Sequence, residues 1–144
     1  MWNYRINVES IYPDVKIELQ MIKNLVKTVL SEEGISQAEI NIILANDKYI
    51  IKLNQDFLNK DITTDVLSFN LEDEPHNQIE GEVYVNIEQI KRQARDFQVT
   101  FREELFRILI HGVLHLIGFN DQKDEEKAIM TKKEDNYLAS LNDK

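Results

Sequence analysis

Apolar and polar residues follow one another along the chain in patterns that predict interleaved strands and helices. Short alternating or β-branched runs predict strands at Trp2 to Val8, Glu39 to Leu44, Asp65 to Phe69 and Glu82 to Val85. Apolar residues at helical spacing predict helices at Asp14 to about Glu33, Asp47 to about Asp56, Asn86 to Phe97, Thr100 to Gly118 and about Asp124 to Leu141. The interleaving favours an α/β or α+β fold with a four-stranded sheet.

Local signals mark where some of these elements begin and end. Gln89 follows Asn86 by three residues, and Glu103 follows Thr100 at the same spacing, which is typical of helix N-caps. The acidic segment 71–81, LEDEPHNQIEG, is too long for a tight hairpin, so we expect an exposed loop there.

The helix predicted from Thr100 to Gly118 carries two histidines. It is apolar almost all round, which places it at the centre of the core. His111 and His115 are four residues apart and therefore lie on one face of this helix, about 5–6 Å apart at Cβ. An unpaired polar group inside a protein costs about 1–3 kcal/mol, so both rings need partners. One metal ion bound from the same side would satisfy them.

The residues beyond the second histidine extend the pattern to H-x-x-x-H-x-x-G-x-x-D, in the segment HGVLHLIGFND. Gly118 permits a sharp turn, so that Asp121 returns to the two histidines as a third ligand. A His₂Asp set leaves one position open for water, which is the mark of a catalytic metal site. Peptidases of related spacing carry glutamate directly after the first histidine as general base. Gly112 stands there instead, which argues against a peptidase.

Other interpretations of these residues are open. Two neighbouring histidines are often satisfied by the core without a metal. Asn120 can supply the oxygen in place of Asp121, although a neutral amide is the weaker donor. The third histidine, His76, lies in the acidic loop and is expected on the surface. A 2-His-1-carboxylate set also occurs in non-haem iron oxygenases, but their ligands normally sit on β-scaffolds rather than on one helix.

Composition limits the kinds of protein and metal site. With 144 residues, 42% hydrophobic and 30% charged, the chain is expected to form one globular domain over residues 1–144. It has no cysteine, so a metal would need histidine and carboxylate ligands. Neither a run of eighteen apolar residues nor a secretory signal is visible, which predicts a cytoplasmic protein without a membrane span.

Charge is unevenly distributed along the chain. The formal net charge of -9 argues against a broad basic surface of the kind that holds nucleic acid. Residues 61–90 contain many acidic residues and neither lysine nor arginine. Positive charge gathers directly after them, in Lys91, Arg92, Arg95, Arg102 and Arg107. A local basic groove on an acidic protein is therefore compatible with the sequence.

Three segments together resemble a known family. HGVLHLIGFND is similar to the signature H-G-x-L-H-L-x-G-Y-D-H of the YbeY family of bacterial endoribonucleases. TTDVLSFN resembles the family's T-[DN]-V-L-S-F stretch, and LNQDFLNKD before it resembles the segment that precedes this stretch in the family. GEVYVN resembles a third, weaker motif. Order and spacing agree over roughly residues 45–130.

The resemblance implies a mixed four-stranded sheet flanked by helices, a bound zinc ion and cleavage of single-stranded RNA. It also implies maturation of the small-subunit rRNA 3′ end and ribosome quality control, with rRNA and the small ribosomal subunit as partners and no DNA. The family's metal ligands fall on His111, His115 and Asp121, the last of which replaces a histidine. A second departure is Leu58, where the family typically has an arginine that acts on the phosphate.

From this resemblance and the metal geometry we expect hydrolysis of a phosphodiester bond. The metal would lower the pKa of a bound water toward about 7 and polarise a phosphoryl oxygen. Lys60, Ser68 and Arg95 are candidates for holding RNA phosphates, and no general base can be named. The alternative is a non-catalytic ribosome-associated factor whose metal only holds the last helix in place. The loss of the arginine at position 58 favours that alternative.

Overall fold

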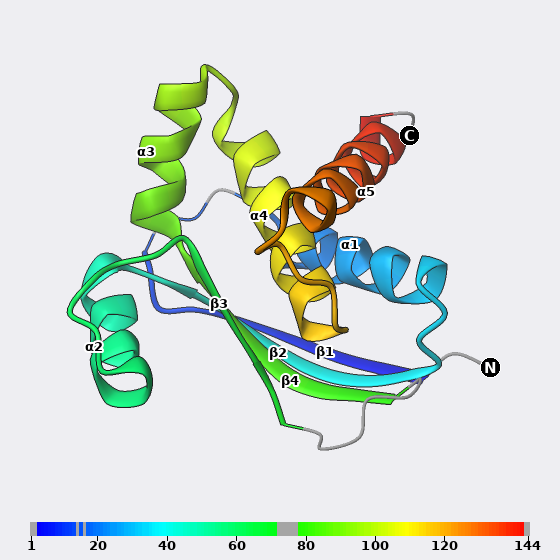
Figure 1. Cartoon of the computed structure of the whole chain (residues 1–144), viewed down its shortest axis with the longest axis horizontal. Coiled ribbons are helices and arrows are strands. Elements are labelled where there is room, and N and C mark those ends of the chain that lie inside the picture. Colours follow the sequence, from blue (N-terminus) through cyan, green and yellow to red (C-terminus); the bar gives the residue numbers. More distant parts are fainter. Residues whose placement is uncertain (1–2, 14, 16, 72–77, 143–144) are drawn as a thin grey trace.

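The computed structural model describes residues 3–13, 15, 17–71 and 78–142 (Figure 1). Its strands are β1 (Asn3–Ser10), β2 (Gln37–Ala45), β3 (Val66–Asn70) and β4 (Gln78–Asn86). Its helices are α1 (Leu19–Glu32), α2 (Asp47–Leu58), α3 (Ile87–Phe97), α4 (Phe101–Leu116) and α5 (Asp124–Asn142). Trp2 and His76, which the sequence places in a strand and in a surface loop, lie outside the described residues.

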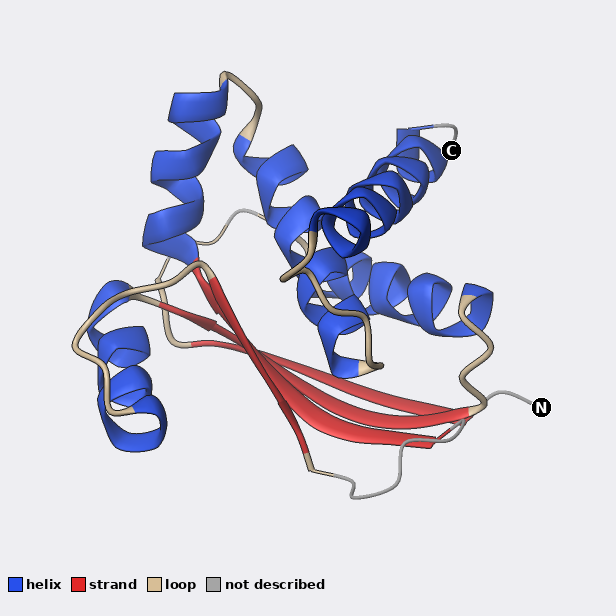
Figure 2. Ribbon diagram, viewed as in Figure 1, coloured by secondary structure: helices blue, strands red, loops and turns tan. Residues whose placement is uncertain are grey.

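The strands form one mixed sheet in the order β1-β2-β4-β3 (Figure 2). β1 is parallel to β2 and β2 is parallel to β4, whereas β3 is an edge strand antiparallel to β4. The register places Ile40 of β2 beside Ile6 on one side and Gly81 on the other. The predicted α+β fold with a mixed four-stranded sheet is therefore confirmed.

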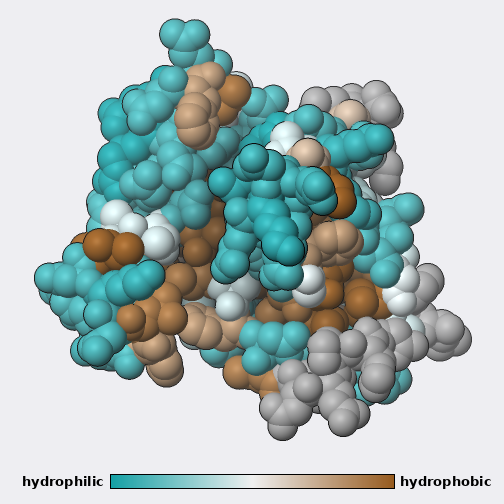
Figure 3. Space-filling model, in the orientation of Figure 1, coloured by the Kyte–Doolittle hydropathy of each residue, from teal (hydrophilic) through white to brown (hydrophobic). Residues whose placement is uncertain are grey.

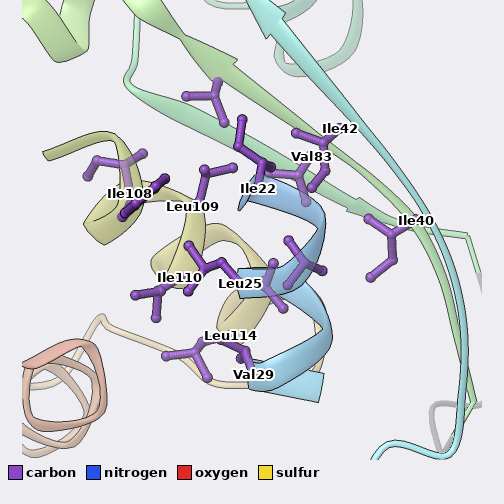
Figure 4. Packing of buried hydrophobic residues seen from close by; sticks show 14 of the residues in the cluster. Ile22, Leu25, Val29, Ile40, Ile42, Val83, Ile108, Leu109, Ile110 and Leu114 are labelled. Atoms are coloured by element: carbon purple, nitrogen blue, oxygen red, sulfur yellow. The ribbon is translucent and has the colours of Figure 1, made fainter. Parts of the chain in front are cut away.

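One face of the sheet carries the main core. α1 and α4 lie across this face, and α5 packs on α4 farther from the sheet (Figures 1 and 2). Figure 4 shows Ile22 and Val29 of α1 together with Leu109 and Leu114 of α4 in this layer. Burying such an aliphatic side chain contributes about 1.5–3 kcal/mol, which makes this layer the main force that holds the helices on the sheet.

α4 is the central buried helix that the sequence predicts. Most of its residues are buried, and it contacts α1, α3, α5, β3 and β4. The side chain of Thr100 caps its N-terminus by accepting a 3.1 Å hydrogen bond from the backbone N–H of Glu103. Asn86 caps α3 in the same way, through Gln89 at 3.2 Å. Both caps are as predicted, and α4 holds the two histidines on a rigid element.

The first helix begins later than the apolar pattern predicts. It starts at Leu19 rather than at Asp14, which lies outside the described residues. Val15 and Ile17 do pack against the core, but from chain that precedes the helix. Glu18, with φ -64° and ψ 128°, is extended. The apolar period therefore correctly predicts that Val15 is at least partly buried, although the backbone is not helical there, whereas Ile17 lies outside that period.

The strand β4 begins inside the acidic segment that was expected to be a loop. It starts at Gln78, and Ile79 and Val83 are buried while Glu80 is exposed. This alternation is the two-residue period of a strand with one face toward the core. The carboxylate of Glu80 is exposed on the other face of the sheet, so the acidic composition around it does not exclude a strand.

The face of the molecule drawn in Figure 3 is mostly hydrophilic. One area of apolar surface lies beside α2, at the left of the picture. Phe57 near the end of α2 is 66% exposed, and Leu58 and Ile62 are exposed as well. Within the described part of the chain, none of the helices is both long enough and apolar enough to cross a membrane.

Candidate metal centre

α4 and the loop after it bring three ligand atoms together. The Nε2 atoms of His111 and His115 are 3.0 Å apart, and the two rings meet edge to face. Oδ2 of Asp121 lies 3.3 Å from Nε2 of each histidine. All three side chains are half-buried. The structure thus brings together the three residues whose spacing predicts a metal site, and Asn120 beside them is exposed.

Gly118 makes the return of the chain to the histidines possible. Its φ of 111° lies in the region that side chains other than glycine rarely adopt. Two hydrogen bonds close the end of α4: the N–H of Gly118 donates to the carbonyl of His115 at 3.1 Å, and that of Phe119 to the carbonyl of Leu114 at 3.0 Å. This reversal carries Asp121 back toward the helix it has just left.

Gly112, the residue after the first histidine, faces the sheet rather than the ligand atoms. A Cβ here would lie 2.9 Å from side-chain carbons of Val66 and Val83 and 3.3 Å from Oγ of Ser68. Oγ of Ser68 donates a 2.8 Å hydrogen bond to the carbonyl of Gly112 and so ties β3 to the helix between the histidines. A glutamate at this position would not fit, so a peptidase-type general base has no place in α4.

The ligand triangle fits one divalent ion. Ligands placed tetrahedrally about 2.0–2.2 Å from a zinc ion lie roughly 3.3–3.5 Å from one another. The three distances of 3.0, 3.3 and 3.3 Å come within a few tenths of an ångström of that spacing. Two imidazole nitrogens and a carboxylate oxygen are also common ligands of divalent transition metals. The group can therefore bind a metal ion and leave a position for water or substrate.

A fourth side chain, which the spacing does not predict, reaches the cluster from α5. Oε2 of Glu134 lies 2.7 Å from Nδ1 of His111, and Oε1 accepts a 3.1 Å hydrogen bond from Nη1 of Arg107. Burial alone would lower the pKa of His111. The hydrogen bond and charge of Glu134, helped by the charge of Asp121, outweigh burial and raise the pKa of His111.

The sequence does contain one signal for Glu134. Met130, Tyr137 and Leu138 are buried and recur at helical spacing on α5, and Glu134 falls in the same stripe with 6% exposure. A carboxylate in the buried stripe of a helix needs a partner, because an unpaired buried charge is costly. The pattern therefore marks the position, but it does not say that the partner is a histidine 23 residues upstream.

The loop that carries Asp121 is held by α5 and α1. The ammonium of Lys133 lies 5.0 Å from the centre of the Phe119 ring and 3.0 Å from a carboxylate oxygen of Glu33, just after α1. The hydroxyl of Tyr137 donates a hydrogen bond to the same carboxylate. These contacts fix the ring of Phe119, two residues before Asp121, and so restrict where the third ligand can lie.

A buried amide holds the loop that precedes β3. Nδ2 of Asn86 donates to Oδ1 of Asp47 at 2.7 Å, to Oγ1 of Thr63 at 2.8 Å and to the carbonyl of Thr64 at 3.2 Å. Arg92 donates to both oxygens of Asp47, at 2.7 and 2.9 Å, and these bonds lower the pKa of Asp47 to about 2. The network joins α2 and α3 to this loop and so positions β3 beside α4.

The three candidate RNA-binding residues lie in different places. Lys60 is exposed in the loop after α2. The hydroxyl of Ser68 already donates a hydrogen bond to the carbonyl of Gly112. Arg95 is exposed in the last turn of α3 and borders a hollow of about 530 Å³. Other residues that line this hollow include Tyr12, Lys91, Arg92 and Phe101. The structure therefore brings the three proposed metal ligands together, but the three candidate RNA-binding residues do not form a cluster of their own around them.

The positive charge that follows residue 90 is partly neutralised within the protein. Arg92 pairs with Asp47 at 2.7 Å. Arg107 pairs with Glu134 at 3.1 Å and with Asp135 at 2.7 Å. Lys91 and Arg95 of this group are exposed and border the hollow beside α3, which Glu88 also lines.

Comparison with known proteins agrees with this arrangement. The family model described as endoribonuclease YbeY matches residues 6–142. Endoribonuclease YbeY of Flavobacterium psychrophilum is 42% identical over 139 residues, which cover 95% of this chain and 92% of that protein. Endoribonuclease YbeY of Karelsulcia muelleri is 44% identical over 116 residues, which cover 81% of each.

The fold is also shared with a solved structure. The solution structure of TM1509 from Thermotoga maritima has a TM-score of 0.66 and 33% sequence identity, and the match covers 94% of this chain and 86% of that one. Sequence, family model and fold agree over nearly the whole chain, so the family suggested by the three motifs is confirmed. This chain belongs to the endoribonuclease YbeY family.

Proposed function

We propose that this chain is a metal-dependent endoribonuclease that cleaves single-stranded RNA and holds one zinc ion through His111, His115 and Asp121. The observation that carries the proposal is the convergence of two ring nitrogens and a carboxylate oxygen within 3.3 Å of one another. The names of its relatives support the nuclease activity. Nitrogen and oxygen ligands with one open position are typical of catalytic zinc, which is why we propose this ion.

The chain's own residues would prepare the site for a phosphate. A bound zinc ion supplies a Lewis acid that lowers the pKa of water toward about 7 and polarises a phosphoryl oxygen. α4 fixes both imidazoles on one face, and the Gly118 turn brings in Asp121. Two neutral imidazoles and one carboxylate do not fully neutralise a divalent ion, so the loaded site keeps a positive charge that attracts an anionic phosphate. A general base is not assigned.

Two exposed cations, Lys60 and Arg95, are the proposed RNA contacts. Lys60 lies two residues after Leu58, which is 47% exposed and offers no charge where the family typically has arginine. Arg95 borders the hollow beside α3, next to Lys91. The hydroxyl of Ser68 can donate to a phosphate only if it gives up its hydrogen bond to the carbonyl of Gly112. We therefore rank Ser68 as a weaker candidate for RNA binding than the two cations.

We further propose that the substrate is ribosomal RNA, at the 3′ end of the small-subunit molecule, and that the small ribosomal subunit is the partner. The family membership of the chain supports this proposal. The net charge of -9 supports a substrate that a partner presents, because broad electrostatic capture of RNA needs many free cations. On this proposal the single domain works in the cytoplasm, in rRNA maturation and ribosome quality control, and DNA is not its substrate.

Cleavage of a labelled single-stranded RNA by the purified full chain tests the activity. Chelator treatment is expected to abolish cleavage and added zinc to restore it. His115→Ala is expected to cut at least about a hundredfold more slowly, because it removes one of three ligands. Asn120→Ala, beside the site but exposed, is the matched control and is expected to cut like the parent. A His115→Ala protein that cleaves as fast as the parent would contradict the proposal.

The lack of charge at Leu58 favours a second candidate, a ribosome-associated factor whose metal is structural. Such a protein would co-sediment with small ribosomal subunits and would not cut RNA under any metal condition. Asp121→Ala would then lower its unfolding temperature in the presence of zinc, since metal that binds only the folded state adds to stability. Co-sedimentation without cleavage would select this candidate over the nuclease.

A further inference from the structure

α5 contributes a buried carboxylate to a cluster whose ligands come from α4 and the loop after it. Glu134 is 6% exposed. Its Oε2 lies 2.7 Å from Nδ1 of His111, while Nε2 of the same ring faces His115 and Asp121. One imidazole therefore joins the carboxylate on α5 to the proposed metal position.

Donor and acceptor chemistry fixes where the ring proton of His111 lies. An ionised carboxylate only accepts hydrogen bonds, and a neutral imidazole carries a single N–H. In the neutral ring, which is the form that binds a metal, the 2.7 Å contact is therefore an Nδ1–H donated to Glu134, and the free lone pair is on Nε2. This is the nitrogen that faces the other two ligand atoms, so a metal can bind without any movement of the ring proton.

Arg107 holds the carboxylate in this position. It lies four residues before His111 on α4 and donates from Nη1 to Oε1 of Glu134 at 3.1 Å, and from Nη2 to Oδ1 of Asp135 at 2.7 Å. One oxygen of Glu134 thus has a guanidinium and the other an imidazole as partner. Breaking a buried pair of this kind is costly, so turning Glu134 away from His111 is unfavourable.

We propose that Glu134 is a positioning residue of the metal centre. It keeps His111 in the Nδ1–H tautomer and points its Nε2 at His115 and Asp121, so the chain is arranged for the ion before the ion binds. Glu134 raises metal affinity without touching the metal itself. This inference rests on the proposed metal site and is independent of which RNA is cut.

Zinc affinity of the full chain, measured by competition with a chromophoric chelator, tests the proposal. Glu134→Gln keeps the size of the side chain but removes its charge, and it is expected to weaken zinc binding about 10–100-fold. Asp135→Asn is the matched control, because it removes the other partner of Arg107 without touching His111. It is expected to bind zinc like the parent. Equal zinc affinity of Glu134→Gln and the parent overturns the proposal.

A measurement without metal separates this proposal from the proposed metal site. Long-range ¹H–¹⁵N NMR spectra report the tautomer of each histidine ring, and the chain has only three histidines to assign. The metal-free parent is expected to show His111 protonated at Nδ1, and Glu134→Gln to lose this preference. His111 protonated at Nε2 in the parent overturns the positioning role. A parent with the expected tautomer that binds no zinc would instead refute the metal site, and with it the effect on affinity.

Discussion

The hydroxyl of Ser68 donates a 2.8 Å hydrogen bond to the carbonyl of Gly112 and joins the edge strand β3 to α4 between its two histidines. The two residues belong to the segments TTDVLSFN and HGVLHLIGFND, which are far apart in the chain. The missing side chain of Gly112 lets the helix approach Val66 and Val83 closely. The strand segment therefore supports the helix that carries the ligands.

Gly112→Ala should destabilise the fold. Its Cβ would come within 2.9 Å of side-chain carbons of Val66 and Val83, so either these side chains or α4 must shift. Overpacking of this kind costs about 1–3 kcal/mol, against a gain of at most about 1 kcal/mol in helix propensity. Urea unfolding measures the difference. Asn136→Ala, exposed on α5, is the control for helix propensity and should not destabilise. A stable Gly112→Ala would mean that α4 and the sheet are not in close contact.

Ser68→Ala should change the stability of the fold, whereas Arg95→Ala should change the affinity for RNA. Loss of the bond to Gly112 is expected to lower the free energy of unfolding by about 0.5–1.5 kcal/mol, with little change in RNA affinity. Arg95→Ala, at an exposed position, should leave stability unchanged and weaken RNA binding. Fluorescence anisotropy with a single-stranded RNA and urea unfolding measure the two quantities. Weaker RNA binding by Ser68→Ala at unchanged stability would assign this hydroxyl to the substrate instead.

Position 121 should tolerate a change of ligand but not the loss of one. Asp121→His supplies the nitrogen ligand that the family typically has, and it is expected to bind zinc. Asp121→Asn keeps the shape but loses the charge, and its zinc affinity is expected to fall at least about tenfold. Calorimetric titration of each chelator-treated protein with zinc gives the affinities. Tight binding by Asp121→Asn would show that the carboxylate, 3.3 Å from both histidines, is not a ligand.

The pair of Asp47 and Arg92 should make stability depend on acid pH. Hydrogen bonds from Arg92 lower the pKa of Asp47 from 3.8 to about 2 in the folded chain. A lowered pKa contributes stability that is fully present above about pH 4 and is lost as the pH falls through about 2. Asp47→Asn should therefore be less stable near neutral pH and lose less stability across that acid range. Thermal unfolding at a series of pH values measures this, and equal losses in both proteins would contradict it.

The His–His–Asp group can be predicted from sequence because its geometry is local. The three residues lie on one helix and the turn that follows, where spacing alone sets which side chains share a face. The same holds for the caps Thr100 and Asn86, each of which accepts from a residue three positions on. The motifs of the family then supply what spacing cannot, which is the expectation of a mixed four-stranded sheet and of a nuclease activity; the order of the strands comes only from the structure.

Contacts between elements are beyond the reach of local spacing. Glu134 meets His111 across 23 residues, and Asn86 meets Asp47 across 39. The first contact exists because α4 and α5 pack together, and the second because β2 and β4 end side by side in the sheet. Which residues face one another in such contacts depends on the packing of the whole core. The start of β4 shows a related limit, since Glu80 lies in a strand whose pairing in the sheet outweighs its acidic composition.

Anomalous diffraction at the zinc absorption edge, from crystals of the untagged chain, tests the metal site directly. A single peak is expected about 2.0–2.2 Å from Nε2 of His111, Nε2 of His115 and Oδ2 of Asp121. No peak between the rings, with the carboxylate of Asp121 turned into solvent, would contradict the account.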